Sequence, residues 1–404
     1  MEKLIITRWK GRILTALFSG RTALQISLEP VEDSSLLNNI YVGRVQTVAS
    51  GINAAFVEFE EGQTGYLSLS EYQPRPLNRP EAKKLASGDE ILVQVSRDKV
   101  KTKAPVLTGL LTLTGRYLVL TPQKPGINFS SKLNSRKLKE DLKPLIEQAL
   151  QECGCPDWGV IVRTNAGIQT PEIILRELKS LAKRCGFILE QAPRRAPKTC
   201  MYQALPGYIC ALRDSYEGKL EAIVTDQEDC FLHLQEYLTE SQPEDLPLLT
   251  RYSDPLVSLS KVCSLEKAIA EATNKRVWLK SGGYLVIEPT EAMTVIDVNT
   301  GKYPGKKDLA ETILQLNLEA AWEIGRQLRL RNLSGIIVAD FIDMERPEDN
   351  QLLMKTLAQA VALDPVKTTV VEMTKLGLVE LTRKKVRRPL AEQLRENEKN
   401  EISR

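Results

Sequence analysis

Two apolar runs in the last third of the chain each lead into carboxylates. One run ends at Asp297, and the other, at 335–339, leads to Asp340 and Asp343. Between them, apolar residues recur at roughly helical spacing over about 308–331, which indicates an amphipathic helix. The pattern therefore predicts a strand, a helix and a second strand, and neighbouring strands bring both carboxylates to one edge of a sheet.

Asn299 adds an amide two residues after the first of these carboxylates. Carboxylate and amide oxygens are hard ligands of the kind that Mg²⁺ requires, so this edge is a candidate metal site. The alternative is that an aspartate after an apolar strand serves only as a turn or helix-cap residue. Asp340 is expected to be structural or to support the ligands rather than to be one of them.

The first 33 residues alternate like a β-hairpin or meander, with Gly11 and Gly20 at the turns. Such a piece is too small to fold alone, so it is expected to pair with a later segment. Residues from about 208 to 275 alternate between strand and helix patterns, and the N-terminal piece can complete their sheet. The chain between the two pieces then becomes an insertion in a discontinuous domain.

Five short strands are predicted between about 36 and 115, with glycines at their turns. This pattern is typical of a small closed barrel of the OB type, which binds single-stranded nucleic acid by stacking bases on exposed aromatic rings. Phe56 and Tyr66 are the candidate stacking residues, with Lys103 and Arg44 as basic neighbours. The apolar run around Phe56 leaves open that this ring belongs to the barrel core instead.

A small α/β unit is predicted from about 114 to 208. Arg163 and Thr164 directly follow one of its buried strands, so they are candidates for holding a phosphate. The alternative is an arginine in a surface loop. The proline-containing stretch at about 191–207 is interpreted as a linker.

Beyond Asp343 the pattern predicts a helix over 350–364, a single strand over 368–384 and a charged, frayed helix or tail from Pro389. Three lysines after the first carboxylate are candidates to contact backbone phosphates: Lys302, Lys306 and Lys307.

Composition narrows the chemistry further. His233 is the single histidine, and its leucine neighbours suggest a helix face rather than a catalyst. A Ser–His–Asp triad, a His–Cys pair, a two-histidine ribonuclease and a multi-histidine metal site are therefore strained or excluded. Any hydrolysis is expected to depend on carboxylates and a metal. The seven scattered cysteines, without an export signal, are expected to be reduced thiols.

The 404 residues allow two to four domains. The sequence contains no run of 18 or more apolar residues, so no membrane span is expected. The N-terminus lacks a secretory pattern, so a cytoplasmic location is expected. The net charge of +3 excludes a general polycation. Basic clusters at 136–139, 194–198 and 383–388 nevertheless favour an anionic partner.

Several long motifs resemble the ribonuclease E/G family. The matching stretches run from near residue 36 to about 385 and read IYVGRVQTV, GINAAFVEF, TGYLSL, RYLVLTP, VIVRTNAG, VWLKSGGYLVIEPTEAMTVIDVNTGKY, NLEAAWEIGRQLRLRNLSGIIVADFIDM and TKLGLVELTRK. The resemblance implies a Mg²⁺-dependent, single-strand-specific endoribonuclease of RNA processing and decay. It implies products with 5′-phosphate and 3′-hydroxyl ends, and a preference for 5′-monophosphorylated RNA.

The resemblance also implies roles for residues in these motifs. The family's two metal-holding aspartates correspond to Asp297 and Asp343, and Asn299 matches the asparagine expected near the scissile phosphate. The family's RNA-binding residues in its OB fold match Phe56, Tyr66 and Lys103. Its pocket for a 5′-monophosphate matches Arg163 and Thr164.

The implied fold class is an α/β multidomain protein. It has a discontinuous ribonuclease-H-like subdomain, an inserted OB-fold barrel, a small α/β sensor of the RNA 5′ end, and a deoxyribonuclease-I-like catalytic subdomain. The expected boundaries are 1–34 and 209–276 for the ribonuclease-H-like parts, 35–115 for the barrel, 116–208 for the sensor, 277–388 for the catalytic subdomain and 389–404 for the tail.

Two further expectations concern partners and competing functions. The family commonly continues into a Cys-Pro-x-Cys zinc link and a small dimerisation domain, but no such cysteines follow LTRKK. Any homo-oligomer is therefore expected to form without that link. The competing functions are a noncatalytic RNA-binding scaffold and a deoxyribonuclease or small-molecule phosphodiesterase. The intact Asp297, Asn299 and Asp343 disfavour the scaffold, and the barrel disfavours the other two.

Overall fold

The computed structural model describes residues 2–31, 35–70, 72–98, 104–133, 135–215, 220–301 and 309–395. Its contacts divide the chain into two compact units. The first unit combines Met1–Val31 with Gly218–Arg404, and the second is Glu32–Glu217. Each unit has its own hydrophobic cores, so each is described by itself.

The first sheet of the discontinuous unit joins the start of the chain to its second half. Its order is β15-β14-β1-β2-β3, and its strands are β1 (Glu2–Trp9), β2 (Arg12–Ser19), β3 (Thr22–Pro30), β14 (Leu220–Thr225) and β15 (Leu249–Arg251). β1 runs antiparallel to β2 but parallel to β14, with Leu4 paired to Ile223. The N-terminal strands therefore complete a sheet whose other strands lie beyond residue 217.

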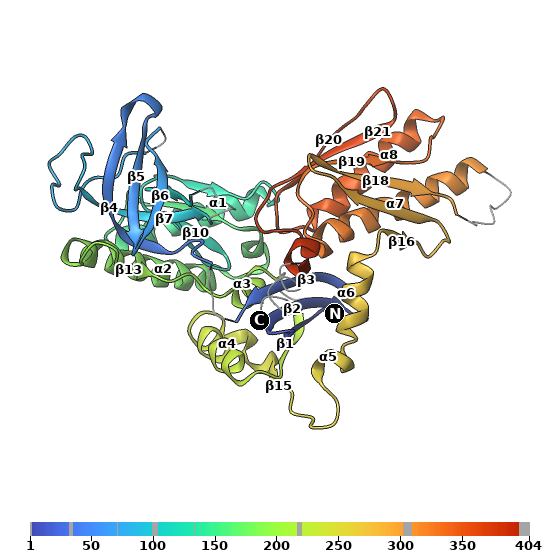
Figure 1. Ribbon diagram of the computed structural model, residues 1–404, viewed down its shortest axis with the longest axis horizontal. Helices are drawn as coiled ribbons and strands as arrows, with labels where there is room; N and C mark the ends of the chain where they lie inside the picture. Colours follow the sequence, from blue (N-terminus) through green and yellow to red (C-terminus); the bar gives the residue numbers. More distant parts are fainter. Residues whose placement is uncertain are drawn as a thin grey trace. The chain divides into compact units, whose positions relative to one another are not determined.

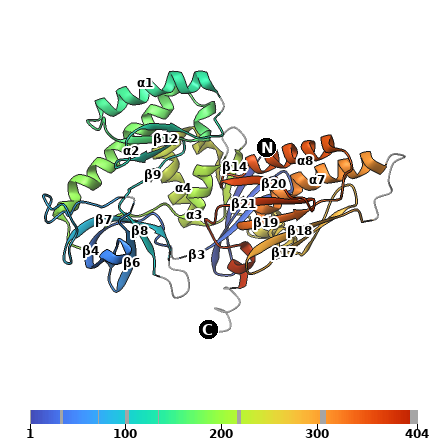
Figure 2. The same cartoon turned by 90° about the horizontal axis from the view of Figure 1, so that it is seen from above.

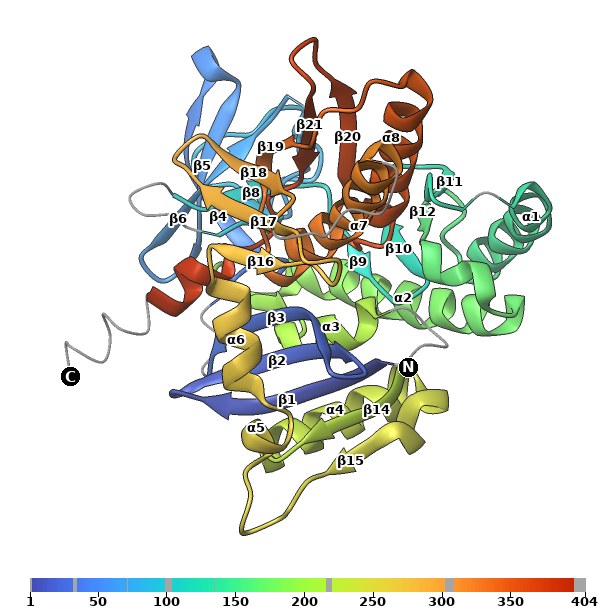
Figure 3. The same ribbon diagram turned by 90° about the vertical axis from the view of Figure 1, so that its right-hand side faces the viewer.

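Helices cover this first sheet. They are α4 (Glu228–Ser241), α5 (Leu259–Val262) and α6 (Leu265–Thr273), with the 3-10 helix η4 (Pro243–Leu248). Figure 3 shows α6 lying across the β1–β3 strands. There Leu265 and Ile269 share a buried core with Ile26, because the apolar positions of α6 fall on one helical face.

The second sheet of this unit carries the two predicted carboxylate motifs. Its order is β16-β17-β18-β19-β21-β20, and its strands are β16 (Arg276–Trp278), β17 (Tyr284–Pro289), β18 (Met293–Asn299), β19 (Gly335–Asp340), β20 (Thr368–Met373) and β21 (Leu378–Arg383). Helix α7 (Leu309–Leu330) lies between β18 and β19 in the chain, and the two strands pair in parallel. The predicted strand, helix and strand are thus confirmed.

The two faces of the second sheet differ. Figure 2 shows α7 and α8 (Pro347–Ala362) side by side along this sheet. Strand residues that point into their shared core are fully or almost fully buried: Leu285, Ile287, Ile296, Val298, Ile337, Ala339, Val379 and Leu381. The alternate residues on the other face are half-buried or exposed. A strand reverses its side chains at each residue, so β18 offers one row to the core and one row to the open face.

The C-terminal part of the described chain is docked rather than free. Residues 390–395 are helical, and Leu390 is fully buried. The side chain of Gln393 accepts a hydrogen bond from the Leu28 N–H at 2.9 Å, and its carbonyl accepts one from Arg12 at 2.7 Å. The prediction of a frayed helix or tail from Pro389 thus corresponds to a helix at residues 390–395 that packs against the first sheet.

The inserted unit begins with a closed five-stranded barrel (Figure 1). Its strands are β4 (Ile40–Ala49), β5 (Ala54–Glu60), β6 (Gln63–Ser68), β7 (Glu90–Arg97) and β8 (Val106–Thr108), and the short 3-10 helix η1 (Ser50–Ile52) joins β4 to β5. Pairing between β4 and β7 closes the ring. This is the OB-like barrel that the five strand patterns predict.

A four-stranded sheet with two long helices follows the barrel. Its order is β11-β12-β10-β9, and its strands are β9 (Leu113–Thr114), β10 (Leu118–Thr121), β11 (Ile127–Phe129) and β12 (Gly159–Val162). The helices of this layer are α1 (Arg136–Glu152), α2 (Pro171–Gln191) and α3 (Gly207–Asp214), with the 3-10 helices η2 (Thr164–Ile168) and η3 (Ala192–Arg194). Barrel residues Ile40 and Val42 share the core of this layer. The barrel and the α/β layer therefore pack as one unit.

Two stretches differ from the sequence interpretation. The linker at about 191–207 contains β13 (Cys200–Tyr202), which pairs with β4. The single strand predicted over 368–384 is a hairpin of β20 and β21, because Gly377 (φ +82°) turns the chain. Among the described residues, no helix combines the length and the apolar character needed to cross a bilayer.

Candidate active site

Asp297 and Asn299 project from the open face at the end of β18. The Asn299 amide donates a hydrogen bond to a carboxylate oxygen of Asp297 at 2.6 Å. Both side chains are half-buried, whereas the intervening Val298 packs into the core with Ile296. The alternation along the strand therefore holds this amide and carboxylate side by side.

Asp340 lies directly across from Asp297. The two residues are register partners in the parallel pairing of β18 with β19, so their side chains share the open face. The pKa of the Asp340 carboxyl is raised, first by partial desolvation and then by the charges of Asp297 and Asp343. The three carboxylates thus create a concentrated negative potential, which a proton or a cation relieves.

Asp343 follows β19 in a short loop that is fixed by a buried amide. The side chain of Asn317 on α7 is fully buried, and it forms a two-way pair with the backbone of Ile342. Its amide donates to the Ile342 carbonyl at 2.8 Å, and its oxygen accepts from the Ile342 N–H at 3.1 Å. Asn317 therefore fixes the backbone next to the exposed Asp343 rather than the Asp343 side chain itself.

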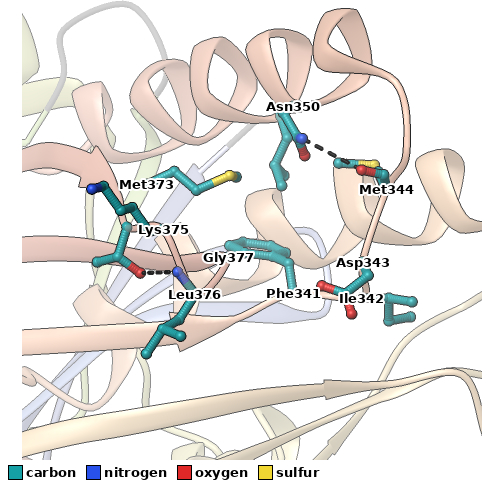
Figure 4. Close-up of a pocket in the computed structure, with 11 residues that line it drawn as sticks. Phe341, Ile342, Asp343, Met344, Asn350, Met373, Lys375, Leu376 and Gly377 are labelled. Carbon is teal, nitrogen blue, oxygen red and sulfur yellow. Dashed lines mark hydrogen bonds between the residues drawn. The ribbon is translucent and has the colours of Figure 1, made fainter.

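A cleft of about 370 Å³ opens beside Asp343. Figure 4 shows Asp343 and Phe341 on one side, Asn350 reaching in from α8, and Lys375 on the β20–β21 turn. Gly377 approaches Asp343 so closely that a Cβ there would lie 3.4 Å from its Oδ1. Asp343 thus lines a cleft that Asn350 and Lys375 also line.

The segment around Gly283 fits tightly against β18. A Cβ on Gly283 would lie 2.8 Å from the Asn299 carbonyl oxygen and 2.5 Å from Cδ1 of Leu316. A Cβ on Gly301 would lie 2.4 Å from the Gly282 carbonyl. Gly283 and Gly301 therefore allow a close backbone approach beside Asn299, and Gly282 adopts a positive φ of +99° that favours glycine.

The donor set suits Mg²⁺. Asp297 and Asp343 offer hard carboxylate oxygens, and Mg²⁺ usually takes one or two carboxylates and fills its other positions with water and substrate phosphate. Among the residues that the structure describes, no three acidic, histidine or cysteine side chains converge as a complete metal cage. A two-carboxylate site open to substrate is consistent with both observations.

The barrel presents Phe56 and Tyr66 as a pair. They are register partners on β5 and β6, with ring centroids 6.1 Å apart in an edge-to-face arrangement. Both are half-exposed, and Val57 and Phe59 of the same strand fill the core instead. Phe56 therefore belongs to the barrel surface, not to its core.

The third predicted RNA-binding residue, Lys103, lies outside the described residues, as do Lys302, Lys306 and Lys307. His233 is exposed on α4, in the helix that its neighbours predict. None of the seven cysteines forms a disulfide bond.

Arg163 and Thr164 directly follow β12, and Thr164 begins the 3-10 helix η2. The Arg163 guanidinium donates to the Gly115 carbonyl at 2.6 Å and to Asp214 at 2.7 Å, and its side chain is 24% exposed. The Thr164 hydroxyl lies 3.0 Å from that of Ser130. Arg163 is thus a partly buried, oriented cation rather than a free surface arginine.

Asp214 is the negatively charged partner of Arg163. Burial opposes ionisation of its carboxyl, but the charges of Arg213 and Arg163 outweigh that effect, and its pKa is lowered.

On α2, the buried carboxyl of Glu177 accepts backbone N–H bonds from Arg116, Tyr117 and Leu118. Burial raises the pKa of Glu177, and these three donors act in the opposite direction.

Comparison with known proteins decides the family. Residues 112–386 match the Ribonuclease E/G family. The chain belongs to the ribonuclease E/G family. It is 36% identical to ribonuclease G of Haemophilus influenzae over 91% of this chain and 76% of that protein. It is 34% identical to ribonuclease G of Escherichia coli K12 over 95% of this chain and 80% of that protein.

The ribonuclease E relatives are longer. The chain is 36% identical to ribonuclease E of a Nostoc species over 86% of its own length, but it spans only 51% of that protein. The family match includes Arg163, Asp297 and Asp343, whereas Phe56 and Tyr66 precede its first residue. The barrel is covered instead by the ribonuclease G alignments, which take in nearly the whole chain.

The sequence motifs identified the carboxylates and the amide but not the residues that position them. Asn317 and the glycine contacts were missed because their role depends on tertiary approach. One signal was present for Asn317, which is an amide on the apolar face of an amphipathic helix. A buried polar group needs a partner, and here the partner is the loop that bears Asp343.

Proposed function

We propose that this endoribonuclease of the ribonuclease E/G family hydrolyses single-stranded RNA at the open face of the second sheet, with Mg²⁺ held by Asp297 and Asp343. The observation that carries the proposal is the register pairing of Asp297 with Asp340, with Asp343 close enough to perturb the same carboxyl. Such a charge cluster on an open sheet face attracts a divalent cation.

Asp297, Asp343 and Asn299 have different roles in the proposed reaction. When bound, Mg²⁺ supplies Lewis acidity that lowers the pKa of a coordinated water and shields the phosphate charge. Asn299 orients Asp297 through its 2.6 Å hydrogen bond, and in this proposal its amide also hydrogen-bonds near the scissile phosphate. Water attacks phosphorus and the bond to the 3′ oxygen breaks, so the products carry a 3′-hydroxyl and a 5′-phosphate.

The substrate class follows from the inserted unit. Phe56 and Tyr66 offer half-exposed rings on the barrel, and stacking on them requires unpaired bases. In this proposal Lys103 contributes charge to the same surface. Thr164, the neighbouring Ser130 hydroxyl and Arg163 form the candidate site for a 5′-monophosphate, because hydroxyls and an oriented guanidinium suit phosphate oxygens.

The subdomain likenesses belong to the same proposal. The order and directions of the first sheet support a ribonuclease-H-like scaffold, and the second sheet with α7 and α8 supports a deoxyribonuclease-I-like catalytic part. A cytoplasmic location, RNA processing and decay as the role in the cell, and any homo-oligomer remain predictions from the sequence.

The test is cleavage of a 5′-monophosphorylated single-stranded RNA oligonucleotide by the purified chain with Mg²⁺. Asp297→Asn is expected to lower the cleavage rate on the order of a thousandfold, because a metal ligand worth several kcal/mol is weakened. RNA binding and thermal unfolding should change little. The matched control is Glu288→Gln, which alters an exposed carboxylate in an ion pair with Lys275, the residue just before β16.

Parallel substrates separate the alternatives. The same RNA with a 5′-hydroxyl should be cut more slowly, and a DNA oligonucleotide of the same sequence should not be cut. Equal cutting of both RNAs would remove the sensor role from Arg163 and Thr164. Normal cleavage by Asp297→Asn would overturn the assignment of the active site, and binding without cleavage would favour the RNA-binding scaffold.

A further inference from the structure

Three side chains form an exposed cluster at the edge of the second sheet. The rings of Trp278 on β16 and Tyr284 on β17 have centroids 5.3 Å apart. The Arg276 guanidinium lies over both rings, 4.4 Å from the Tyr284 centroid and 5.7 Å from that of Trp278. Trp278 is 62% exposed, which is unusual for so large an apolar surface.

Strand register joins this cluster to the active site. Trp278 is paired with Tyr284, and Tyr284 is paired with Asn299. Directly opposed residues point to the same face of a sheet, so the three side chains form one row across the open face. Neighbouring strands are about 4.8 Å apart, so Tyr284 lies one strand spacing from the Asn299–Asp297 pair.

The turn between the two aromatic residues is fixed before any ligand binds. The Leu279 N–H donates to the Gly283 carbonyl at 2.8 Å. On α7, the Glu319 carboxylate accepts from the N–H groups of Lys280 at 2.7 Å and Ser281 at 3.3 Å. A preorganised surface loses little conformational entropy when it binds, so these bonds suit a binding role.

A purely structural role explains the cluster poorly. Cross-strand aromatic pairs do stabilise sheets, but β16 is an edge strand of three residues, and the Trp278 ring leaves most of its surface in water. The core residues of the same sheet face α7 and α8 instead. An exposed indole with a guanidinium beside a negatively charged site matches what an unpaired base and its phosphate need.

We propose that Arg276, Trp278 and Tyr284 form a base-stacking platform for a nucleotide of the RNA next to the bond that is cut. The base stacks on the Trp278 ring, and Arg276 neutralises the neighbouring phosphate, while Tyr284 holds Arg276 in place. This inference rests on the proposed function. It adds a binding subsite beside the reacting bond, separate from the Phe56–Tyr66 pair on the barrel.

The experiment measures binding in the Asp297→Asn background with Mg²⁺, using fluorescence anisotropy of a short single-stranded RNA. The position of the cut is first mapped with the active protein, and each nucleotide within two of the cut is then made abasic in turn. At one of these positions, loss of the base should weaken binding roughly five- to hundredfold. Trp278→Ala should cause a similar loss with the intact RNA.

The decisive reading is the double-mutant cycle. The abasic penalty is the loss of RNA affinity caused by removing the base at that position. In Trp278→Ala this penalty should disappear, because the ring and base that interact have both been removed. Trp278→Phe should restore most of the penalty. The matched control is Trp322→Ala, which removes another exposed tryptophan, 47% exposed on α7, and should leave the penalty unchanged. In the active protein, Trp278→Ala should raise KM more than it lowers kcat.

Two failures are distinguishable. An abasic penalty that persists in full in Trp278→Ala would overturn the platform and leave the nuclease assignment intact. Cleavage of the RNA by the Asp297→Asn background at the rate of the parent protein, seen on a gel, would overturn the proposed function itself. Circular dichroism and thermal unfolding check that each variant is folded.

Discussion

At the residue scale, Asn317 illustrates how a buried amide can control a carboxylate that it does not contact. Both polar atoms of its side chain are used by the backbone of Ile342, one residue before Asp343. A buried polar group that loses its partner costs about 1–3 kcal/mol. The loop therefore has a strong preference for one conformation, and that conformation presents Asp343 to the open face.

Asn317→Ala is expected to lower kcat by about tenfold or more while changing KM little, because Asp343 loses its fixed position and small displacements of catalytic groups are costly. Thermal unfolding should show a loss of about 1–3 kcal/mol from the two unpaired backbone groups. Gln315→Ala on the exposed side of the same helix is the control and should change neither quantity. A normal kcat in Asn317→Ala would separate the loop from catalysis.

Three of the candidate site residues are predicted from residue types alone. Asp297 and Asn299 end one apolar strand and Asp343 follows another, and that local pattern is visible in one sequence. Trp278 was passed over because an aromatic residue in a short strand more often belongs to a core. Only the register, which pairs Trp278 with Tyr284 and Tyr284 with Asn299, shows that it shares the open face with the carboxylates.

At the element scale, a buried ion pair fastens β21 to the segment after α8. Arg383 and Asp364 are 3% and 1% exposed, with an Nε–Oδ2 distance of 2.7 Å. Arg383 also donates to the side-chain oxygen of Asn332 and to the Leu333 carbonyl. The pair therefore connects the turn before β19, the central strand β21 and the start of β20.

Asp364→Ala should lower the free energy of unfolding by about 3–5 kcal/mol, because it leaves a buried guanidinium without its counter-ion. Denaturant unfolding followed by circular dichroism measures the change. Glu271→Ala removes an exposed i,i+4 pair with Lys267 on α6 and should cost about 0.5 kcal/mol or less. Comparable losses in the two variants would contradict the role given to the buried pair.

A second ion pair gives the barrel a pH dependence. The Asp89 carboxylate accepts two hydrogen bonds of 2.7 Å from Arg79 and one from the Ala86 N–H. The hydrogen bonds from Arg79 are the leading cause that lowers the pKa of Asp89, against the opposing effect of burial. A lowered folded-state pKa stabilises the protein above the unfolded-state value, and the contribution is lost as the pH falls through the folded-state value.

Asp89→Asn is therefore expected to destabilise the inserted unit at neutral pH, and the difference from the parent should shrink below about pH 4. Chemical unfolding of both proteins at a series of pH values provides the comparison. A difference that stays constant down to strongly acidic pH would show that the loss comes from packing rather than from ionisation.

Hydrophobic periodicity predicted the long elements better than the turns between them. The α7 crossover and the five barrel strands could be predicted because each repeats its pattern over a whole element. The β20–β21 hairpin could not, since both strands are apolar and only the positive φ of Gly377 separates them. Strand β13 could not be predicted, because three residues between prolines show no hydrophobic periodicity.

At the scale of the whole molecule, the chain consists of two units with separate cores. In the part of the chain that the structure describes, the residues of the core around β1–β3 and of the core of the second sheet all lie outside 32–217. The N-terminal strands could be assigned to a later sheet from sequence because they were too few to fold alone. Their exact partner, β14 in parallel, required the three-dimensional structure.

Unfolding in denaturant is expected to show two transitions rather than one, because independent cores break two-state behaviour. Asp364→Ala should shift one transition and Asp89→Asn the other. Mg²⁺ should stabilise only the transition that Asp364→Ala shifts, since a ligand stabilises the unit that binds it. A single transition moved by both substitutions would show that the two units unfold together.

The parallel pairing of β1 with β14 also has a consequence for synthesis. On the ribosome, β1–β3 emerge first, but their neighbour β14 follows only after Glu32–Glu217 has been made. At about 5–20 residues per second, that delay is on the order of ten to forty seconds. During it, the nascent chain carries an unpaired β1 edge lined by Leu4, Ile5 and Ile6, and such an edge invites pairing with other chains. Protection of this edge during synthesis, for example by a chaperone, is therefore expected to raise the yield of folded protein.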